Sequence, residues 1–258
     1  MNKLNKSLTP LPSASPLSKR REENLIARFA VIYRMKIQIL FASILIFIFN
    51  TSFMKEEKKH TMLCLGDSYT IGESVEENER FPMQAIELLK KENIEFEKPI
   101  IIARTGWTTD ELATAINERN LRSKYDYVTL LIGVNNQYRG RDLENYRKEF
   151  HELLNTAIAY VNGNTNHIFV ISIPDWGVTP FGNSDKRGEK KIGDEIDLFN
   201  TINKEEALKA KAHYVDITPV SREAKTNPAL IAGDGLHPSG KMYAEWAKKL
   251  VEEMKKVD

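Results

Sequence analysis

From about residue 60 onward, short apolar runs alternate with longer stretches in which apolar residues recur at helical spacing. The runs are mostly apolar, as strands covered on both faces of a parallel sheet are, and they lie at 61–65, 99–103, 127–132, 168–173 and 214–217. The helical patterns lie near 81–92, 108–119, 142–161, 194–211 and 240–256. This alternation predicts one α/β domain over residues 61–258, a parallel five-stranded sheet with helices on both faces in a three-layer α/β/α arrangement.

Capping residues place the starts of two of these helices. Thr108 followed by Glu111 has the form of a capping box, and Ser239 is a suitable cap for the last helix. Tyr243 and Trp246 lie on one face of that last helix. Their helical spacing predicts that they pack in the core rather than contact a ligand.

Residues 1–60 differ from this pattern and form a separate N-terminal extension. Residues 7–18 are rich in Pro and Ser without a usable period, which predicts disorder. A basic stretch then precedes an apolar run over 37–54. Basic residues before an apolar run hold the N-terminus in the cytoplasm and send the downstream part of the chain outward.

The apolar run has two interpretations, a signal peptide that is removed and a membrane anchor that is retained. Met35 opens the run as a signal peptide would begin, so Met35 is an alternative to Met1 as the start. In both cases we expect export to the cell envelope, either to the periplasm or as an anchored domain that faces outward. Membrane contact is expected through residues 37–54.

Charge and cysteine content exclude several classes of protein. Residues 1–60 hold 11 basic and 4 acidic side chains, which leaves 26 basic and 32 acidic side chains in the rest of the chain. An acidic main body argues against nucleic acid as a partner, because nucleic-acid affinity comes mostly from neutralised phosphates. The single cysteine, Cys64, excludes an internal disulfide framework and a Cys-based zinc site, and its apolar surroundings predict a buried thiol.

The residues directly after the predicted strands are the first place to search for a site, because parallel sheets bind ligands at the carboxyl ends of their strands. A short polar or glycine-containing segment comes after each of the first four strands, and another precedes the last helix. These segments are Gly66-Asp67-Ser68-Tyr69, Arg104-Thr105-Gly106-Trp107, Gly133-Val134-Asn135-Asn136, Pro174-Asp175-Trp176-Gly177 and Asp234-Gly235-Leu236-His237-Pro238.

Together these segments hold the groups that acyl transfer requires. Ser68 is a candidate nucleophile, His237 the base that takes and returns its proton, and Asp234 the carboxylate that orients the imidazole. Charge that develops on a carbonyl oxygen needs preplaced donors. The candidates are the backbone N–H groups of Ser68 and Gly106 and the side-chain amide of Asn135.

Four blocks that occur in order over residues 61–240 carry a family resemblance: Gly66-Asp67-Ser68, Gly106, Gly133-x-Asn135 and Asp234-x-x-His237. This set resembles the GDSL/SGNH hydrolase superfamily, in which Ser, Gly, Asn and His each mark one block. The resemblance implies a flavodoxin-like sheet, ester hydrolysis through an acyl-serine, and neither a metal nor an organic cofactor. Two positions depart from the family pattern: Asn136 stands where Asp is usual, and Arg104-Thr105 stands where Asn most often precedes the glycine.

Further residues near these blocks are candidates for substrate contact or for structural roles. Trp107, Trp176 and Arg104 are predicted to bind substrate, with Phe181 in the same apolar wall. Residues 174–193 are predicted to form a long mobile lip beside the cleft. Asp67 is expected to accept hydrogen bonds from its own turn. Asp175 is a less favoured rival to Asp234, and the remaining histidines are expected to be structural: His60, His151, His167 and His213.

The sequence thus predicts a serine esterase of the cell envelope that acts on lipid or general acyl esters, such as a lysophospholipase. A carbohydrate O-deacetylase has the same catalytic set with a smaller acyl pocket, and a non-catalytic envelope binding protein is the rival from another class. The expected partner is a small-molecule ester or a lipid or glycan ester. A nucleotide-binding module is disfavoured because phosphate-cradling glycine loops are absent.

Overall fold

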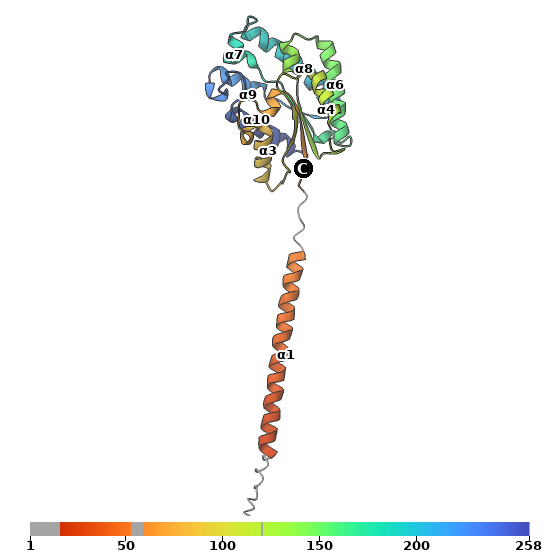
Figure 1. Cartoon of the computed structure of the whole chain (residues 1–258), viewed down its shortest axis with the longest axis vertical. Helices are drawn as coiled ribbons and strands as arrows, with labels where there is room; N and C mark the ends of the chain where they lie inside the picture. The colour runs from red at the N-terminus through yellow and green to blue at the C-terminus, as the bar shows by residue number, and fades with distance from the viewer. Residues whose placement is uncertain (1–15, 53–58, 120, 258) are drawn as a thin grey trace, which may run out of the picture. The chain divides into compact units, whose positions relative to one another are not determined.

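The computed structural model describes residues 16–52, 59–119 and 121–257. The chain divides into two units, residues 1–57 and 58–258. The described part of the first unit is helix α1 (Pro16–Ser52), whose described side chains are all exposed (Figure 1). The stretch predicted to be disordered overlaps this helix at 16–18, and its remaining residues lie outside the described part of the chain.

The predicted apolar run at 37–54 lies within α1 up to Ser52. Residues 53 and 54 and the side chains of 42–52 lie outside the described residues. Among the described residues, none of the helices combines the length and the hydropathy that a membrane crossing requires.

The second unit is built on five parallel strands in the order β2-β1-β3-β4-β5. The strands are β1 (Met62–Gly66), β2 (Ile100–Ala103), β3 (Tyr127–Leu131), β4 (Ile168–Ile171) and β5 (His213–Val215). In the register of the central strands, Leu63 pairs with Ile100 on one side and with Val128 on the other. The predicted flavodoxin-like parallel sheet is confirmed, with each boundary within two residues of its prediction.

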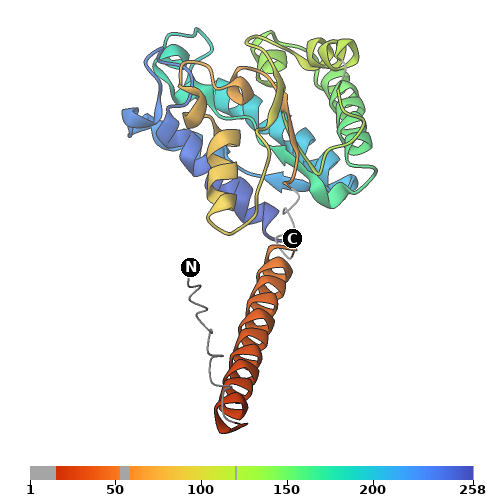
Figure 2. The same ribbon diagram turned by 60° about the horizontal axis from the view of Figure 1, so that its bottom comes forward.

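Two groups of helices cover the two faces of the sheet (Figure 1, Figure 2). Helices α3 (Phe81–Lys90) and α10 (Gly240–Met254) lie on one face. The other face carries α4 (Thr109–Glu118), α6 (Leu143–Tyr160) and α8 (Glu189–Lys209). All five helices were predicted, although α8 begins five residues earlier than its pattern indicates.

Short helical turns connect these elements, and the sequence pattern did not predict them because they are too short to show a period. The α-helical turns are α2 (Ser68–Ile71), α5 (Val134–Tyr138), α7 (Pro180–Asn183) and α9 (Thr218–Arg222). The 3₁₀ turns are η1 (Glu77–Glu79), η2 (Thr165–His167), η3 (Trp176–Val178), η4 (Glu223–Lys225) and η5 (Pro228–Leu230).

The local predictions for helix starts and for the core are confirmed. Thr108 and Glu111 form a capping box at α4, and the Ser239 hydroxyl accepts from the backbone N–H of Met242 at α10. The rings of Tyr243 and Trp246 are buried. Every residue of β1 and β3 is buried, which explains their apolar composition. Burial also raises the pKa of the Cys64 thiol to about 12, so this thiol is not a nucleophile.

The strand order fixes where a site forms. From β1 the chain crosses to β2 on one side, and from β2 it passes back to β3 on the other side of β1. The connections that leave β1 and β3 therefore diverge, and a crevice forms between them at the carboxyl ends of these strands. Ser68 follows β1 and Asn135 follows β3, so both lie at this crevice.

Candidate active site

Ser68 is the first residue of α2, directly after Asp67 at the N-cap. Oδ1 of Asp67 accepts a hydrogen bond from the backbone N–H of Tyr69 at 3.0 Å, as the sequence predicted for this turn. The first N–H groups of a helix have no acceptor within the helix. The N–H of Ser68 is therefore available to a ligand beside the Ser68 hydroxyl.

The carboxyl of Asp67 is fully buried beneath the nucleophile. Burial raises its pKa to about 7, despite the opposing hydrogen bond from Tyr69. Its second oxygen, Oδ2, has no hydrogen-bond partner within the described part of the chain. Asp67 therefore holds the backbone of the nucleophile's turn by a hydrogen bond, and its carboxyl is ionised only in part of the molecules near neutral pH.

His237 and Asp234 form a hydrogen-bonded pair in the turn before α10. Nδ1 of His237 lies 2.6 Å from Oδ2 of Asp234. Oδ1 of Asp234 accepts from the backbone N–H groups of Leu236 and His237 at 2.9 and 3.0 Å. Burial opposes ionisation of this carboxyl, yet its hydrogen bonds, first of all the one from His237, hold its pKa well below the ordinary value. An ionised Asp234 fixes the tautomer of His237, with Nε2 free to act as a base.

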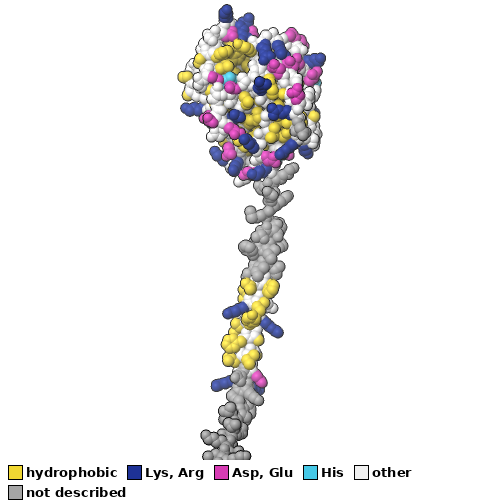
Figure 3. Space-filling model, in the orientation of Figure 1, with side chains coloured by type: hydrophobic (Ala, Val, Ile, Leu, Met, Phe, Trp, Pro, Cys, Tyr) yellow, Lys and Arg dark blue, Asp and Glu magenta, His cyan; other side chains and the backbone are white. Residues whose placement is uncertain are grey.

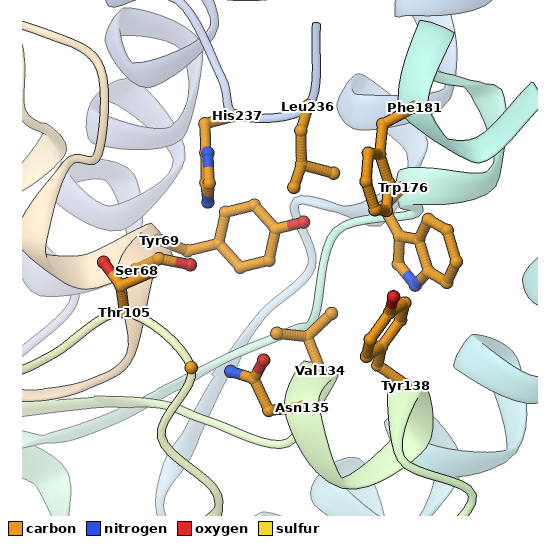
Figure 4. Close-up of a pocket in the computed structure, with 11 residues that line it drawn as sticks. Ser68, Tyr69, Thr105, Val134, Asn135, Tyr138, Trp176, Phe181, Leu236 and His237 are labelled. Carbon is orange, nitrogen blue, oxygen red and sulfur yellow. The ribbon is translucent and has the colours of Figure 1, made fainter. Parts of the chain in front are cut away.

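Ser68 and His237 line the same pocket, which has a volume of about 190 Å³. Figure 4 shows the imidazole pointing toward the Ser68 hydroxyl, with the side chain of Asn135 on the other side of the pocket. The other residues that line it are Tyr69, Thr105, Gly106, Val134, Tyr138, Trp176, Phe181 and Leu236. The structure thus brings together groups that are 169 positions apart in the sequence.

Each of the three predicted oxyanion donors lines this pocket. Gly106 has a φ of +86°, a left-handed conformation that favours glycine, and its carbonyl accepts from Arg139 at 2.7 Å. The amide of Asn135 donates one hydrogen to the Trp107 carbonyl at 2.9 Å, which leaves its second hydrogen for a ligand. Backbone N–H and side-chain amide donors thus face one pocket together with Ser68.

A second glycine allows Asn135 to reach this position. Gly133 is the N-cap of α5 and has a φ of +127°. A Cβ atom at this residue would lie 2.3 Å from the hydroxyl of Tyr146. The turn after β3 therefore needs glycine both for its conformation and for the close approach of α6.

Two of the predicted substrate contacts do not line the pocket. Trp107 packs against the core, and Arg104 is exposed outside the pocket. The turn after β2 closes with a hydrogen bond from Trp107 N–H to the Arg104 carbonyl at 3.2 Å, and Gly106 within this turn lines the pocket. Trp176 does line the pocket, as predicted.

The remaining wall residues were not predicted as contacts, apart from Phe181, which lies in the predicted lip. Tyr138 is on the short helix α5, and Leu236 lies between Asp234 and His237. Adjacency to a catalytic block is the signal that could have identified Leu236 and Tyr69. Residues 174–193 form η3, α7 and the first turn of α8 beside the pocket, where a long lip was predicted.

Contacts behind the pocket hold the rings of Trp176 and Tyr138, which form its aromatic wall. Nε1 of Trp176 donates to Gln137 at 2.9 Å, and Gln137 donates to Glu195 on α8 at 2.6 Å. The guanidinium of Arg187 lies 5.0 Å from the ring centre of Trp176 and 5.3 Å from that of Tyr138. These contacts fix the position of the wall from outside the pocket.

The other polar residues that were considered for the site make their contacts away from Ser68 and His237. Asp175 accepts from the backbone N–H of Gly177 and from Arg222, each at 2.9 Å, so it does not orient His237. Asn136 is fully buried and bonds both the N–H and the hydroxyl of Thr109, which ties α5 to the start of α4. The histidines outside the pocket have other partners: Phe96 and Tyr127 for His60, Glu206 for His151, Asp126 for His167 and Glu253 for His213.

The surface around the site carries both charged and apolar side chains. Positive and negative side chains are interspersed on the face of the second unit that Figure 3 shows, and an apolar patch with a histidine beside it lies on the same face. Within the described residues, no group of three His, Cys, Asp or Glu side chains could hold a metal ion.

A parallel sheet with a serine, a His–Asp pair and three candidate oxyanion donors at its topological switch point is the arrangement of an SGNH-type ester hydrolase. Comparison with protein families gives the same class. The chain belongs to the GDSL-like lipase/acylhydrolase family, whose model matches residues 64–245. The family predicted from the four sequence blocks is therefore confirmed.

The fold is similar to that of several solved structures, among them the following three. Axe2, an acetylxylan esterase from Geobacillus stearothermophilus, is 20% identical with a TM-score of 0.58, over 78% of this chain and 96% of that chain. A lipase/acylhydrolase from Enterococcus faecalis is 19% identical with a TM-score of 0.58, over 76% and 96%. TesA is 16% identical with a TM-score of 0.56, over 76% and 98%. No curated protein sequence matches the chain.

Proposed function

We propose that this protein is an exported serine esterase that hydrolyses esters of short acyl groups through an acyl-serine intermediate. The observation that carries the proposal is the shared pocket: Ser68 and His237 line it together with the donors Gly106 and Asn135. A binding protein would not need a nucleophile, a base fixed by a carboxylate and donors for a developing charge in one place.

The geometry supports a two-step reaction. His237 takes the proton of Ser68 as the Ser68 oxygen forms a bond to the ester carbonyl carbon, and the carbonyl oxygen becomes an oxyanion held by the three donors. Collapse of this intermediate breaks the bond to the alcohol oxygen, and the alcohol leaves with the proton from His237. Water then attacks the acyl-serine in the same way, which releases the acid and frees Ser68. Asp234 stays ionised throughout and stabilises the imidazolium.

The size of the pocket indicates the acyl group. A pocket of about 190 Å³ has room for several water-sized groups. The rings of Tyr138 and Trp176 limit it on one side and are fixed from behind by Gln137 and Arg187. We therefore infer a preference for acetyl to hexanoyl groups over chains as long as palmitoyl, which would extend beyond this volume.

A carbohydrate O-deacetylase is the second candidate, because a small acyl pocket is what an acetyl ester requires. The similar structure of an acetylxylan esterase is consistent with it, although its 20% identity supports only the fold. Acetylated oligosaccharides and simple acetyl esters of small alcohols would distinguish this candidate from a general short-chain esterase.

The N-terminal extension supports the proposed export. Its basic stretch precedes an apolar run over 37–54, the order that sends the downstream domain outward. Cell fractionation of the full chain tests this point: recovery of all the protein in the cytoplasm would refute it.

Labelling with a fluorophosphonate probe, combined with mass mapping of the labelled peptide, tests the chemistry. We expect the full chain to be labelled at Ser68, Ser68→Ala to lose both labelling and hydrolysis of p-nitrophenyl butyrate, and Ser123→Ala, an exposed serine, to keep both. Activity on p-nitrophenyl esters should peak between acetyl and hexanoyl. Full activity of Ser68→Ala would remove Ser68 from the mechanism, and a maximum at palmitoyl would refute the proposed acyl size.

A further inference from the structure

Ser74 is an exposed residue in the segment just after the nucleophile's helix α2. Its hydroxyl donates a hydrogen bond to Oδ2 of Asp234 at 2.7 Å, although the two residues are 160 positions apart. Ser74 lies outside the four sequence blocks, so no motif identifies it. It nevertheless contacts the carboxylate that orients the proposed base.

The contact is made to the oxygen that faces the imidazole. Oδ1 of Asp234 is fixed by two backbone N–H groups of its own turn, whereas Oδ2 accepts from Nδ1 of His237 and from Ser74. The side chain of Asp234 is 31% exposed. Without the Ser74 hydroxyl, mobile water would take its place at Oδ2, and the carboxylate would be held on that side by His237 alone.

The same segment is attached to the other parts of the site. The N–H groups of Gly72 and Glu73 both donate to the carbonyl of Ser68 at 3.1 Å. The carboxylate of Glu73 accepts from the hydroxyl of Thr105, next to Gly106. Residues 72–74 therefore link the nucleophile's turn, the oxyanion loop and, through Ser74, the carboxylate of the His–Asp pair.

The backbone conformation of Ser74 must be separated from the effect of its hydroxyl. Its φ is +65°, in the left-handed region that serine rarely adopts. Like Asn93, Asn162 and Lys211, Ser74 lies within three residues after the end of a helix, where such conformations are common. Glycine at residue 74 would relieve this conformation but would remove the hydroxyl.

We propose that Ser74 is a positioning residue, whose hydroxyl holds Oδ2 of Asp234 in line with His237 and ties this pair to the turn that carries Ser68. The inference rests on the proposed esterase function. It assigns to the segment after the first block a role in the alignment of the nucleophile with its base. Ser74 acts only through Asp234 and does not line the pocket.

Two substitutions in the full chain distinguish the effect of the Ser74 hydroxyl from the effect of the backbone conformation. Ser74→Ala removes the hydroxyl and keeps the strained conformation, and Ser74→Gly removes both. We expect each to lower kcat for p-nitrophenyl butyrate about tenfold with KM within twofold of wild type, because water partly replaces a hydrogen bond to a charged group. The rate of fluorophosphonate labelling at Ser68 should fall by the same factor. Lys211→Gly, which relieves a positive φ far from the pocket, should leave both rates unchanged.

The outcomes distinguish this inference from the function on which it rests. Wild-type rates in both Ser74 variants would overturn it, as would a loss in Ser74→Ala that Ser74→Gly restores, since this would assign the effect to the backbone. Should Ser74→Ala fail to fold, Ser74→Gly alone decides. If the wild type neither hydrolyses esters nor is labelled, the proposed function fails. If the wild type reacts and the variants match it, only the role of Ser74 fails.

Discussion

Replacement of Asn135 by alanine tests the oxyanion site most directly. The side chain donates one amide hydrogen to the Trp107 carbonyl at 2.9 Å and offers the second to the pocket. Loss of one such donor costs about 2.7–4 kcal/mol in the transition state, which lowers kcat by about 100- to 1000-fold. KM should change little, because the donor is engaged mainly when the carbonyl oxygen becomes charged.

The same substitution has a separate effect on stability. The Trp107 carbonyl loses its partner, which costs about 0.5–1.5 kcal/mol. For a domain of this size the cost corresponds to a fall in Tm of about 1–6 °C, at about 2–4 °C for each kcal/mol. The catalytic loss is thus much larger than the loss in stability explains, and the two effects are measured independently.

Steady-state kinetics with p-nitrophenyl butyrate and thermal unfolding monitored by circular dichroism are the assays. Asn136→Ala is the matched control: it removes the bonds to Thr109 outside the pocket, so it should lower Tm while it keeps kcat within tenfold of wild type. A kcat for Asn135→Ala within threefold of wild type, or a change confined to KM, would refute the assignment of Asn135 as an oxyanion donor.

Two further predictions concern the wall of the pocket and the buried carboxyl beneath Ser68. Trp176→Ala should shift the best p-nitrophenyl ester toward longer acyl chains, with Trp176→Phe as the milder variant, and an unchanged chain-length profile in both would show that this wall does not set the limit. The pKa of Asp67 rises on folding from 3.8 to about 7, so between these pH values the native state binds a proton that the unfolded state has lost. The free energy of unfolding that this proton contributes is complete below pH 4 and is lost as the pH rises through 7. Asp67→Asn should remove up to about 4 kcal/mol of this loss, and equal pH dependence of Tm in variant and wild type between pH 5 and 8 would contradict the raised pKa.

The sheet could be predicted from the sequence because its strands are buried on both faces. Runs such as 127–132 are almost entirely apolar, and their short length favours a buried strand over a helix. The start of α4 was predictable for a local reason as well, since Thr108 and Glu111 cap each other within one turn. The short turns α2 and α5 were not predictable in the same way, because four or five residues show no period.

The candidate catalytic residues could be predicted because each is tied to the end of a regular element. Ser68 opens a helix directly after β1, Asn135 follows β3 by way of Gly133, and His237 shares a four-residue turn with Asp234. Such residues occur in short blocks at fixed places in the fold. The parallel topology then brings the blocks to one edge of the sheet without further information from the sequence.

The lining of the pocket is harder to predict from the sequence, since Trp107 and Arg104 follow a strand and yet do not line it. Whether a side chain after a strand faces the pocket depends on how its turn closes. The turn at Trp107 closes with a hydrogen bond from its N–H to the Arg104 carbonyl, and its ring packs against the core.

Trp176 is held at the pocket by Gln137 on the short helix α5, which accepts its indole N–H, and Gln137 in turn donates to Glu195 on α8. These contacts join residues that no short block contains. The blocks therefore predict the chemistry. The preference for one acyl group over another depends on long-range contacts, which only the folded chain shows. For this reason the chain-length profile of the Trp176 variants tests the substrate proposal independently of the test of Ser68.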